Sequence, residues 1–260
     1  MSYDYTILIF IFLFGAIVGS FLNCVIYRLE IGKSFIGGRS FCPKCKKEIK
    51  ARDLIPIISF VLLRGKCRYC QSRISLQYPL VEFLTAILFV IVFLYSSSLF
   101  SLVFLLPIFA LMILIFVYDL KYYLIPDSAI LLAILLTVIW HITVMPIEQI
   151  TPFVFSAIGA SLFFATIYFV SKGEWIGFGD VKLALFMGLF LGFPNIFVAL
   201  FLSFVIGSVV GVLAILLKKK KLKSELPFAP FLISGTILAF FYGSEILNWY
   251  LDLININAIF

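Results

Sequence analysis

The stretch Leu99–Tyr118, LFSLVFLLPIFALMILIFVY, contains 20 residues without a charge, and Asp119 follows it directly. The hydrocarbon core of a bilayer is about 30 Å thick, and a helix of roughly 20 apolar residues crosses it. This stretch therefore predicts a transmembrane helix whose last turn carries a carboxylate.

Similar runs recur along the whole chain, of which 63% is hydrophobic and only 13% charged. The runs are continuous and do not alternate between apolar and polar residues, which excludes the strands of a membrane barrel. We therefore predict an all-α polytopic membrane protein with about eight transmembrane helices. The predicted spans are Tyr5–Tyr27, Tyr78–Tyr95, Leu99–Tyr118, Ser128–Val144, Thr151–Val170, Val181–Phe193, Asn195–Leu217 and Phe228–Tyr242.

The basic residues lie on one side of the predicted spans. Twelve of the 20 are in the loop 28–73, and the others are Lys121, Lys172, Lys182, Lys218–Lys221 and Lys223. Because basic residues near span ends are retained in the cytoplasm, both termini are expected outside. This topology accounts for the net charge of +7, so membrane lipid is an expected partner and nucleic acid is not.

Only one segment is long enough for an extramembrane domain. We predict a first transmembrane helix at 1–27, a cytoplasmic four-cysteine domain at 28–77 and a transmembrane catalytic domain at 78–260. Within the second, Leu54–Leu63 is apolar but too short to span a bilayer, which favours a core element or an interfacial segment.

Four of the five cysteines form two C-x-x-C pairs, Cys42 with Cys45 and Cys67 with Cys70. Two such pairs at this separation are typical of a tetrahedral zinc site with four thiolates. A reducing cytoplasm argues against disulfides. Four thiolates leave no open coordination position for water, so we predict a structural zinc ion, not a catalytic one.

Three aspartates lie at predicted span ends on the cytoplasmic side. Asp119 is at a helix C-terminus, where the helix dipole disfavours a negative charge, so a structural role suits it poorly. Asp127 precedes a span and is expected mainly to cap it. Asp180 follows Gly177-Phe178-Gly179 and opens a helix that is too short to cross the bilayer, which favours a wet cavity within the membrane.

Two aspartates in such a place suit peptide hydrolysis without a covalent intermediate. Carboxyl groups a few ångströms apart share a proton, so one can act as base toward water and the other as acid. The chain has a single histidine, His141, toward the outer end of a span, and neither a Gly-x-Ser-x-Gly nor an H-E-x-x-H motif. Serine and zinc peptidase chemistry are therefore excluded.

Several motifs resemble those of the bacterial prepilin peptidases, which are intramembrane aspartyl proteases. The resemblance runs from Gly19 to about Gly243 and includes the aspartates and cysteines above. The motifs are Gly19–Arg28 (GSFLNCVIYR), Gly38-Arg-Ser-x-Cys42-x-x-Cys45, Cys67-x-x-Cys70, Tyr78–Glu82 (YPLVE), Asp119 with Ile125-Pro126-Asp127, Gly177–Lys182 (GFGDVK) and Leu226–Phe231 (LPFAPF).

The resemblance implies that Asp119 and Asp180 are catalytic, with motif support from Gly177, Gly179, Asp127 and Lys182. It implies a type IV prepilin or pseudopilin as substrate, cleaved after the leader glycine by an enzyme of the bacterial inner membrane. It also implies N-methylation of the new N-terminus from S-adenosylmethionine, although the sequence has no glycine-rich nucleotide motif. A Gly-x-Gly-Asp protease of the signal-peptide-peptidase type and a transporter are the alternatives.

Overall fold

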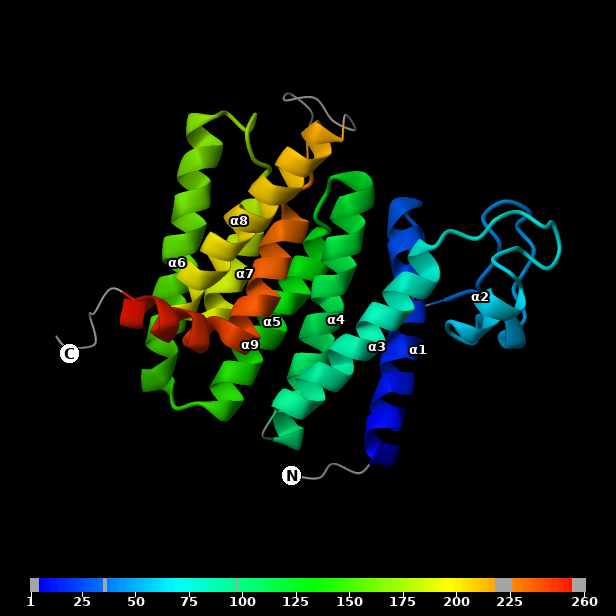
Figure 1. The fold of residues 1–260 in the computed structure, drawn as a ribbon, viewed down its shortest axis with the longest axis horizontal. Helices are drawn as coiled ribbons and strands as arrows, with labels where there is room; N and C mark the ends of the chain where they lie inside the picture. The colour runs from blue at the N-terminus through cyan, green and yellow to red at the C-terminus, as the bar shows by residue number, and fades with distance from the viewer. Residues whose placement is uncertain (1–4, 35–36, 97, 218–225, 254–260) are drawn as a thin grey trace. The chain divides into compact units, whose positions relative to one another are not determined.

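The computed structural model describes residues 5–34, 37–96, 98–217 and 226–253. The described residues are almost entirely helical: they contain no β-strand, only two isolated bridges (Figure 1). The predicted all-α fold is therefore confirmed. The helices are α1 Tyr5–Glu30, the 3-10 helix η1 Ala51–Leu54, α2 Ile58–Leu62, α3 Gln77–Tyr95, α4 Leu99–Tyr122, α5 Asp127–Val144, α6 Ile147–Val170, α7 Phe178–Leu191, α8 Asn195–Leu216 and α9 Ala229–Leu253.

Seven of the described helices are long and apolar enough to cross a membrane: α1, α3, α4, α5, α6, α8 and α9. The eighth predicted span corresponds to α7, which has 14 residues and is therefore only about 21 Å long. The predicted set of about eight helices thus consists of seven full-length spans and one helix that is too short to cross the bilayer, as its length in the sequence predicted. The helix ends early because Gly192 follows it with φ +66°, a conformation that favours glycine and stops the helix.

The chain forms two compact units, which divide between Leu114 and Ile115. In the first unit, α1 packs against α3 at Gly15 and Gly19. A Cβ atom at these two glycines would lie 2.7 Å from the Cα atoms of Ala86 and Glu82, respectively. Small residues allow such close helix contacts in lipid, so these two glycines are packing positions.

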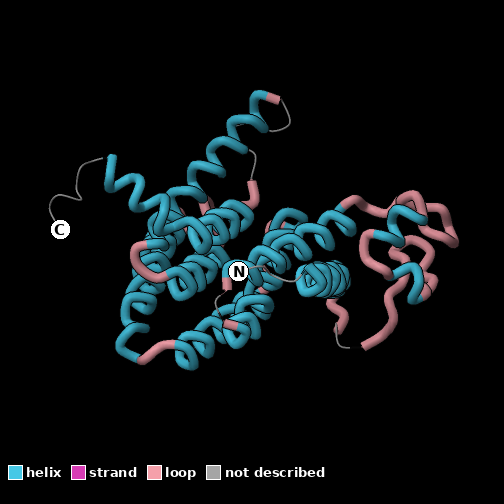
Figure 2. Tube along the Cα trace, turned by 60° about the horizontal axis from the view of Figure 1, so that its bottom comes forward, coloured by secondary structure: helices cyan, strands magenta, loops and turns pink. Residues whose placement is uncertain are grey.

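The segment between α1 and α3 is mostly loop, with η1 and α2 as its only described helices (Figure 2). The sequence predicted that the apolar run Leu54–Leu63 is either a core element or an interfacial segment. No residue of η1 or α2 is buried, so a core element is wrong, and Val61 and Leu62 are largely exposed. An interfacial position stays a prediction.

In the second unit, α5 to α9 lie beside one another (Figure 1). The helix α7 is nearly surrounded, with nine of its 14 residues buried. Its Gly188 abuts the backbone of Ala157 on α6, while Gly235 of α9 abuts Ala199 of α8. The short helix is thus the centre of this unit, and its N-terminus carries Asp180. The basic run Lys218–Lys223 lies outside the described residues.

Candidate active site and metal centre

Asp119 lies in the last turn of α4 and is 5% exposed. Its carboxylate oxygen Oδ2 accepts a hydrogen bond from the backbone N–H of Ala229, with an N–O distance of 3.2 Å. Ala229 is the first residue of α9, so this N–H has no partner within its own helix. The positive end of α9 thereby offsets the unfavourable position of Asp119 at the C-terminus of α4.

Asp180 is the third residue of α7 and is 8% exposed. Its Oδ2 atom accepts a hydrogen bond from the backbone N–H of Gly177, the N-cap residue, at 3.1 Å. This is the acidic half of a capping box, and it places a carboxylate at the positive end of the helix. Each of the two aspartates therefore lies against the N-terminus of a helix.

The structure brings the two aspartates near enough for their charges to interact. Both side chains are buried, and each keeps one bonded oxygen. Two such carboxyl groups hold a single shared proton more easily than two negative charges. A base and an acid side by side can activate a water molecule and protonate a leaving group.

The supporting motif residues meet at the same place. A Cβ atom on Gly179 would lie 3.1 Å from Cβ of Ile125, so the loop before α5 packs directly on the start of α7. Lys182 of α7 donates a hydrogen bond to Oδ1 of Asp127 at 2.6 Å. The segment 125–127, which follows Asp119, therefore contacts the first turn of α7 on both sides of Asp180.

The predicted capping role of Asp127 is wrong. The N-cap residue of α5 is Pro126, whose side chain has no hydrogen-bond acceptor. No side chain caps this helix with a hydrogen bond. Asp127 is the first helical residue, and its carboxylate is 65% exposed and turned to Lys182. A negative charge still suits this first turn, but the ion pair with α7 is its specific contact.

His141, the only histidine of the chain, is distant from this site. It lies 14 residues after Asp127 on α5, which is about 21 Å along the helix. Its ring is 1% exposed, and its Nε2 atom lies 2.8 Å from the carbonyl oxygen of Leu189. It therefore belongs to the packing between α5 and α7.

The four predicted cysteine ligands come together in the first unit. The Sγ atoms of Cys42, Cys45, Cys67 and Cys70 all lie within 4.8 Å of one another. Four thiolates 2.3 Å from a tetrahedral zinc ion are about 3.8 Å apart, and the Cys42 and Cys70 sulfurs are 3.9 Å apart. The cluster can therefore hold a zinc ion.

The two cysteine pairs have the same backbone. The backbone N–H of Cys42 donates a hydrogen bond to the carbonyl oxygen of Lys47 at 2.9 Å. The backbone N–H of Cys67 donates in the same way to the carbonyl oxygen of Ser72 at 2.8 Å. The residue after each pair, Lys46 or Gln71, has a positive φ, 58° or 56°. Both loops thus turn in the same way and direct their sulfurs to one point.

Polar contacts around the cluster favour thiolate ligands and a fixed loop. The Ser72 hydroxyl lies 3.1 Å from Sγ of Cys70, and this hydrogen bond lowers the pKa of Cys70 to about 6. Arg68 donates to both carboxylate oxygens of Asp53, from Nη2 at 2.6 Å and from Nε at 2.9 Å. This bidentate pair lowers the pKa of Asp53 and joins η1 to the second cysteine loop.

Two buried charged residues fix the loop to the helices of the first unit. Arg28, at the end of α1, donates to the carbonyls of Ser34, Gly38 and Arg39. Glu82 of α3 accepts a hydrogen bond from the N–H of Ile57 at 2.7 Å. Their place in the GSFLNCVIYR and YPLVE motifs was the only sequence signal for either residue.

These features define a class, a multi-pass helical membrane protein with a buried acidic site and a four-cysteine module. Residues 13–96 match the family model of the bacterial peptidase A24 N-terminal domain, and residues 106–212 match that of the type IV leader peptidase family. The chain belongs to the type IV leader peptidase family, whose members are multi-pass proteins of the bacterial inner membrane.

Curated relatives cover almost the whole chain. A prepilin leader peptidase/N-methyltransferase of Bacillus subtilis is 35% identical over 94% of this chain and 97% of its own length. Relatives of the same name in Legionella pneumophila and Aeromonas salmonicida are 31% and 33% identical, over 96% and 94% of both chains. No solved structure matches the chain.

Proposed function

We propose that this protein is a prepilin leader peptidase that hydrolyses the bond after the leader glycine of type IV prepilins or pseudopilins. The observation that carries the proposal is the buried pair Asp119 and Asp180, each bonded to a helix N-terminus, in a chain of the type IV leader peptidase family. The names of the relatives supply the substrate class.

In the proposed reaction, one carboxylate of the pair removes a proton from a water molecule. The water oxygen bonds to the carbonyl carbon of the leader glycine, while the protonated carboxyl group donates its proton to the carbonyl oxygen. The C–N bond then breaks as the leaving amine takes up the proton held by the first carboxyl group. A hydroxyl proton of the intermediate returns to the second carboxylate, which reforms the carbonyl group and restores the pair. The hydrogen bonds from Gly177 and Ala229 orient the two side chains for these transfers.

The four-cysteine cluster is proposed to bind one structural zinc ion. When it is bound, the ion supplies only cross-links between the two cysteine loops, since four thiolates fill its coordination shell. The hydrogen bonds to Cys70 and between Arg68 and Asp53 support this role, because they fix the loops around the cluster. A closed site of this kind stabilises a loop segment that has little core of its own.

For the topology, we propose that both termini face the outside and that the cysteine module and the aspartates face the cytoplasm. The distribution of basic residues supports this orientation. It agrees with a division into a first helix at 1–27, the module at 28–77 and a catalytic domain at 78–260. A basic prepilin leader would remain on the same side as the acidic site.

A second activity, N-methylation of the new N-terminus, is proposed on the printed names of the relatives. Its donor would be S-adenosylmethionine. The described residues contain no strand that could form a nucleotide-binding strand-turn-helix, so no step is assigned to particular side chains.

The test uses purified protein in detergent with a synthetic prepilin. Mass spectrometry should show loss of the leader, and addition of S-adenosylmethionine should add one methyl group to the mature product. The variants Asp119→Asn and Asp180→Asn, folded and inserted as the wild type is, should leave the prepilin intact. Leader removal by either variant would contradict the aspartyl mechanism.

A further inference from the structure

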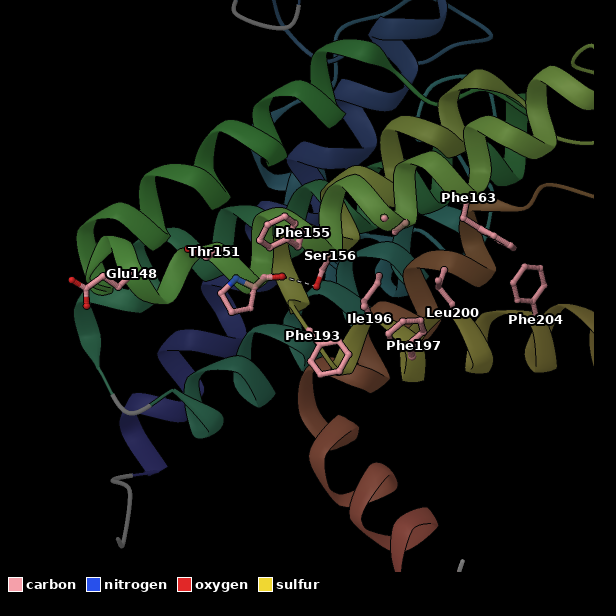
Figure 3. Close-up of a pocket in the computed structure, with 13 residues that line it drawn as sticks. Glu148, Thr151, Phe155, Ser156, Phe163, Phe193, Ile196, Phe197, Leu200 and Phe204 are labelled. Carbon is pink, nitrogen blue, oxygen red and sulfur yellow. Dashed lines mark hydrogen bonds between the residues drawn. The ribbon is translucent and has the colours of Figure 1, made fainter. Parts of the chain in front are cut away.

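An apolar cavity of about 940 Å³ lies between α6 and α8 in the second unit (Figure 3). It runs along α6 from Glu148 to Phe163, a rise of about 22 Å. On the other side it is lined by residues from Phe193 to Phe204. We call it the α6–α8 groove.

The floor and walls of the groove suit a helix better than a flexible chain. Its floor contains Ser156, Gly159 and Ala160, and a Cβ atom on Gly159 would meet nothing within 4 Å. Small residues allow a second helix backbone to approach closely in lipid. The hydroxyl of Ser156 is already bonded to the carbonyl of Pro152 at 2.7 Å, so an apolar occupant does not leave this hydroxyl unpaired (Figure 3).

One end of the groove adjoins the acidic site. Phe204 contacts the ring of Phe228, at a centroid distance of 5.7 Å, and Phe228 also contacts Phe164 at 6.0 Å. Phe228 directly precedes Ala229, whose N–H is bonded to Asp119. An apolar helix in the groove would therefore have one end beside the segment that orients a catalytic carboxylate.

The chain direction shows that this end is the catalytic end. Helix α6 runs from Ile147, at the Glu148 end of the groove, toward Val170, and the next helix begins with Asp180 in its first turn. A prepilin carries its leader junction at the cytoplasmic end of an apolar membrane helix, as the proposed function requires. A groove that runs along α6 and α8 and ends near the carboxyl pair fits that geometry.

We propose that the α6–α8 groove binds the apolar transmembrane helix of the prepilin and so presents its leader junction to Asp119 and Asp180. This inference rests on the proposed function and adds to it the surface that recognises the substrate. A lipid acyl chain is the competing occupant. It would not require the small residues on the floor or the proximity of one end to Ala229.

The first experiment is site-specific photocrosslinking in the Asp180→Asn background, which keeps the prepilin uncut. A benzoylphenylalanine at Phe197, 62% exposed on the groove wall, should crosslink to a synthetic prepilin in lipid nanodiscs. The same label at Leu135, 54% exposed on α5 and outside the groove, is the matched control and should not. Crosslinks from Phe197 to lipid alone, or equal prepilin crosslinks at both positions, would overturn the inference.

The second experiment fills the groove without removing a contact. Gly159→Phe should raise KM for prepilin about tenfold or more with little change in kcat, because it removes binding shared by substrate and transition state. Gly159→Ala is the control, since its methyl group enters open space and should leave KM nearly unchanged. Thermal melting should show that both variants are folded.

The two proposals fail in distinguishable ways. A wild-type protein that does not remove the leader would overturn the proposed function and, with it, the groove as a prepilin site. A wild-type protein that cleaves normally, together with an unchanged KM in Gly159→Phe, would overturn the groove alone.

Discussion

The four-cysteine module and the acidic site are both clusters of ionisable side chains, but the chain builds them differently. The cysteines lie within 29 residues of sequence, in two loops of the same conformation. The acidic site joins Asp119, Asp180 and Ala229, which are separated by up to 110 residues and come from α4, α7 and α9. One site is local in the sequence, and the other depends on helix packing.

This difference has an energetic consequence. A module with little core of its own depends on its metal for stability, whereas the acidic site is maintained by the packed helices around it. The two sites should therefore fail independently. A variant that damages one of them should leave the other intact.

The largest effect is expected from the catalytic pair. Asp119→Asn or Asp180→Asn should reduce the rate of leader removal by roughly a thousandfold or more, and the double variant should be hardly slower, because the two residues act as one unit. Zinc content should stay at about one ion per chain, which is the control that the module is intact. Additive losses in the double variant would contradict a shared proton.

The second effect concerns the metal. Cys42→Ala should abolish zinc binding, as measured by metal analysis, since three thiolates no longer close the tetrahedral site. Limited proteolysis should then cut the segment 42–73 rapidly, while leader removal falls by less than about tenfold because the acidic site is packed elsewhere.

The control for this prediction is Cys24→Ala, which removes the one cysteine that is not part of the cluster. It should keep zinc and resist the protease as the wild type does. If Cys42→Ala lost leader removal as completely as Asp180→Asn, the two sites would be coupled, and the conclusion that they fail independently would be wrong.

The sequence was sufficient for features that are local. Continuous apolar runs predicted the helices, and the C-x-x-C spacing predicted a cluster that the fold indeed assembles. The short length of the helix that carries Asp180 was also expected from the sequence. In each case the determining residues are neighbours in the chain, so no knowledge of packing was needed.

The parts that sequence could not supply depend on contacts between distant segments. Nothing near Asp119 indicates that the N–H of Ala229 would offset its charge. Asp127 had the sequence position of a cap, but the proximity of α7 directs it to Lys182 instead. The tight crossing of Gly188 with Ala157 does not follow from glycine spacing, because Gly192, four residues further on, lies beyond the end of α7 and does not extend the contact.

A smaller effect is expected from the ion pair inside the module. Asp53→Asn should lower the stability of the cysteine module by about 1 kcal/mol, the upper range for a well-oriented pair near the surface. Since Arg68 lowers the pKa of Asp53 in the folded state, this contribution is present above the unfolded pKa of about 3.9 and is lost as the pH falls below it. Hydrogen exchange of the module at pH 7 and at a pH well below about 3.9 measures the difference.

In this case the control is leader removal, which should not change. Arg68→Gln should reproduce the loss of protection if the pair is responsible. Equal destabilisation by Asp53→Asn at all accessible pH values would show that the carboxylate charge is not the cause.

The smallest effect is expected at Asp127, and it decides whether the acidic site is limited to its buried pair. The ion pair of Asp127 with Lys182 joins the start of α5 to α7, but both side chains are partly exposed, 65% and 31%. Such pairs contribute about 0–1 kcal/mol, so Asp127→Asn should keep the rate of leader removal within a few-fold of the wild type. Lys182→Met is the matched variant, because it breaks the same contact without touching a carboxylate. If both variants show the same slight loss, the pair only helps to position α7. If Asp127→Asn alone fell as far as Asp180→Asn, a third acid would take part in catalysis, and burial would not distinguish the catalytic carboxylates from the rest.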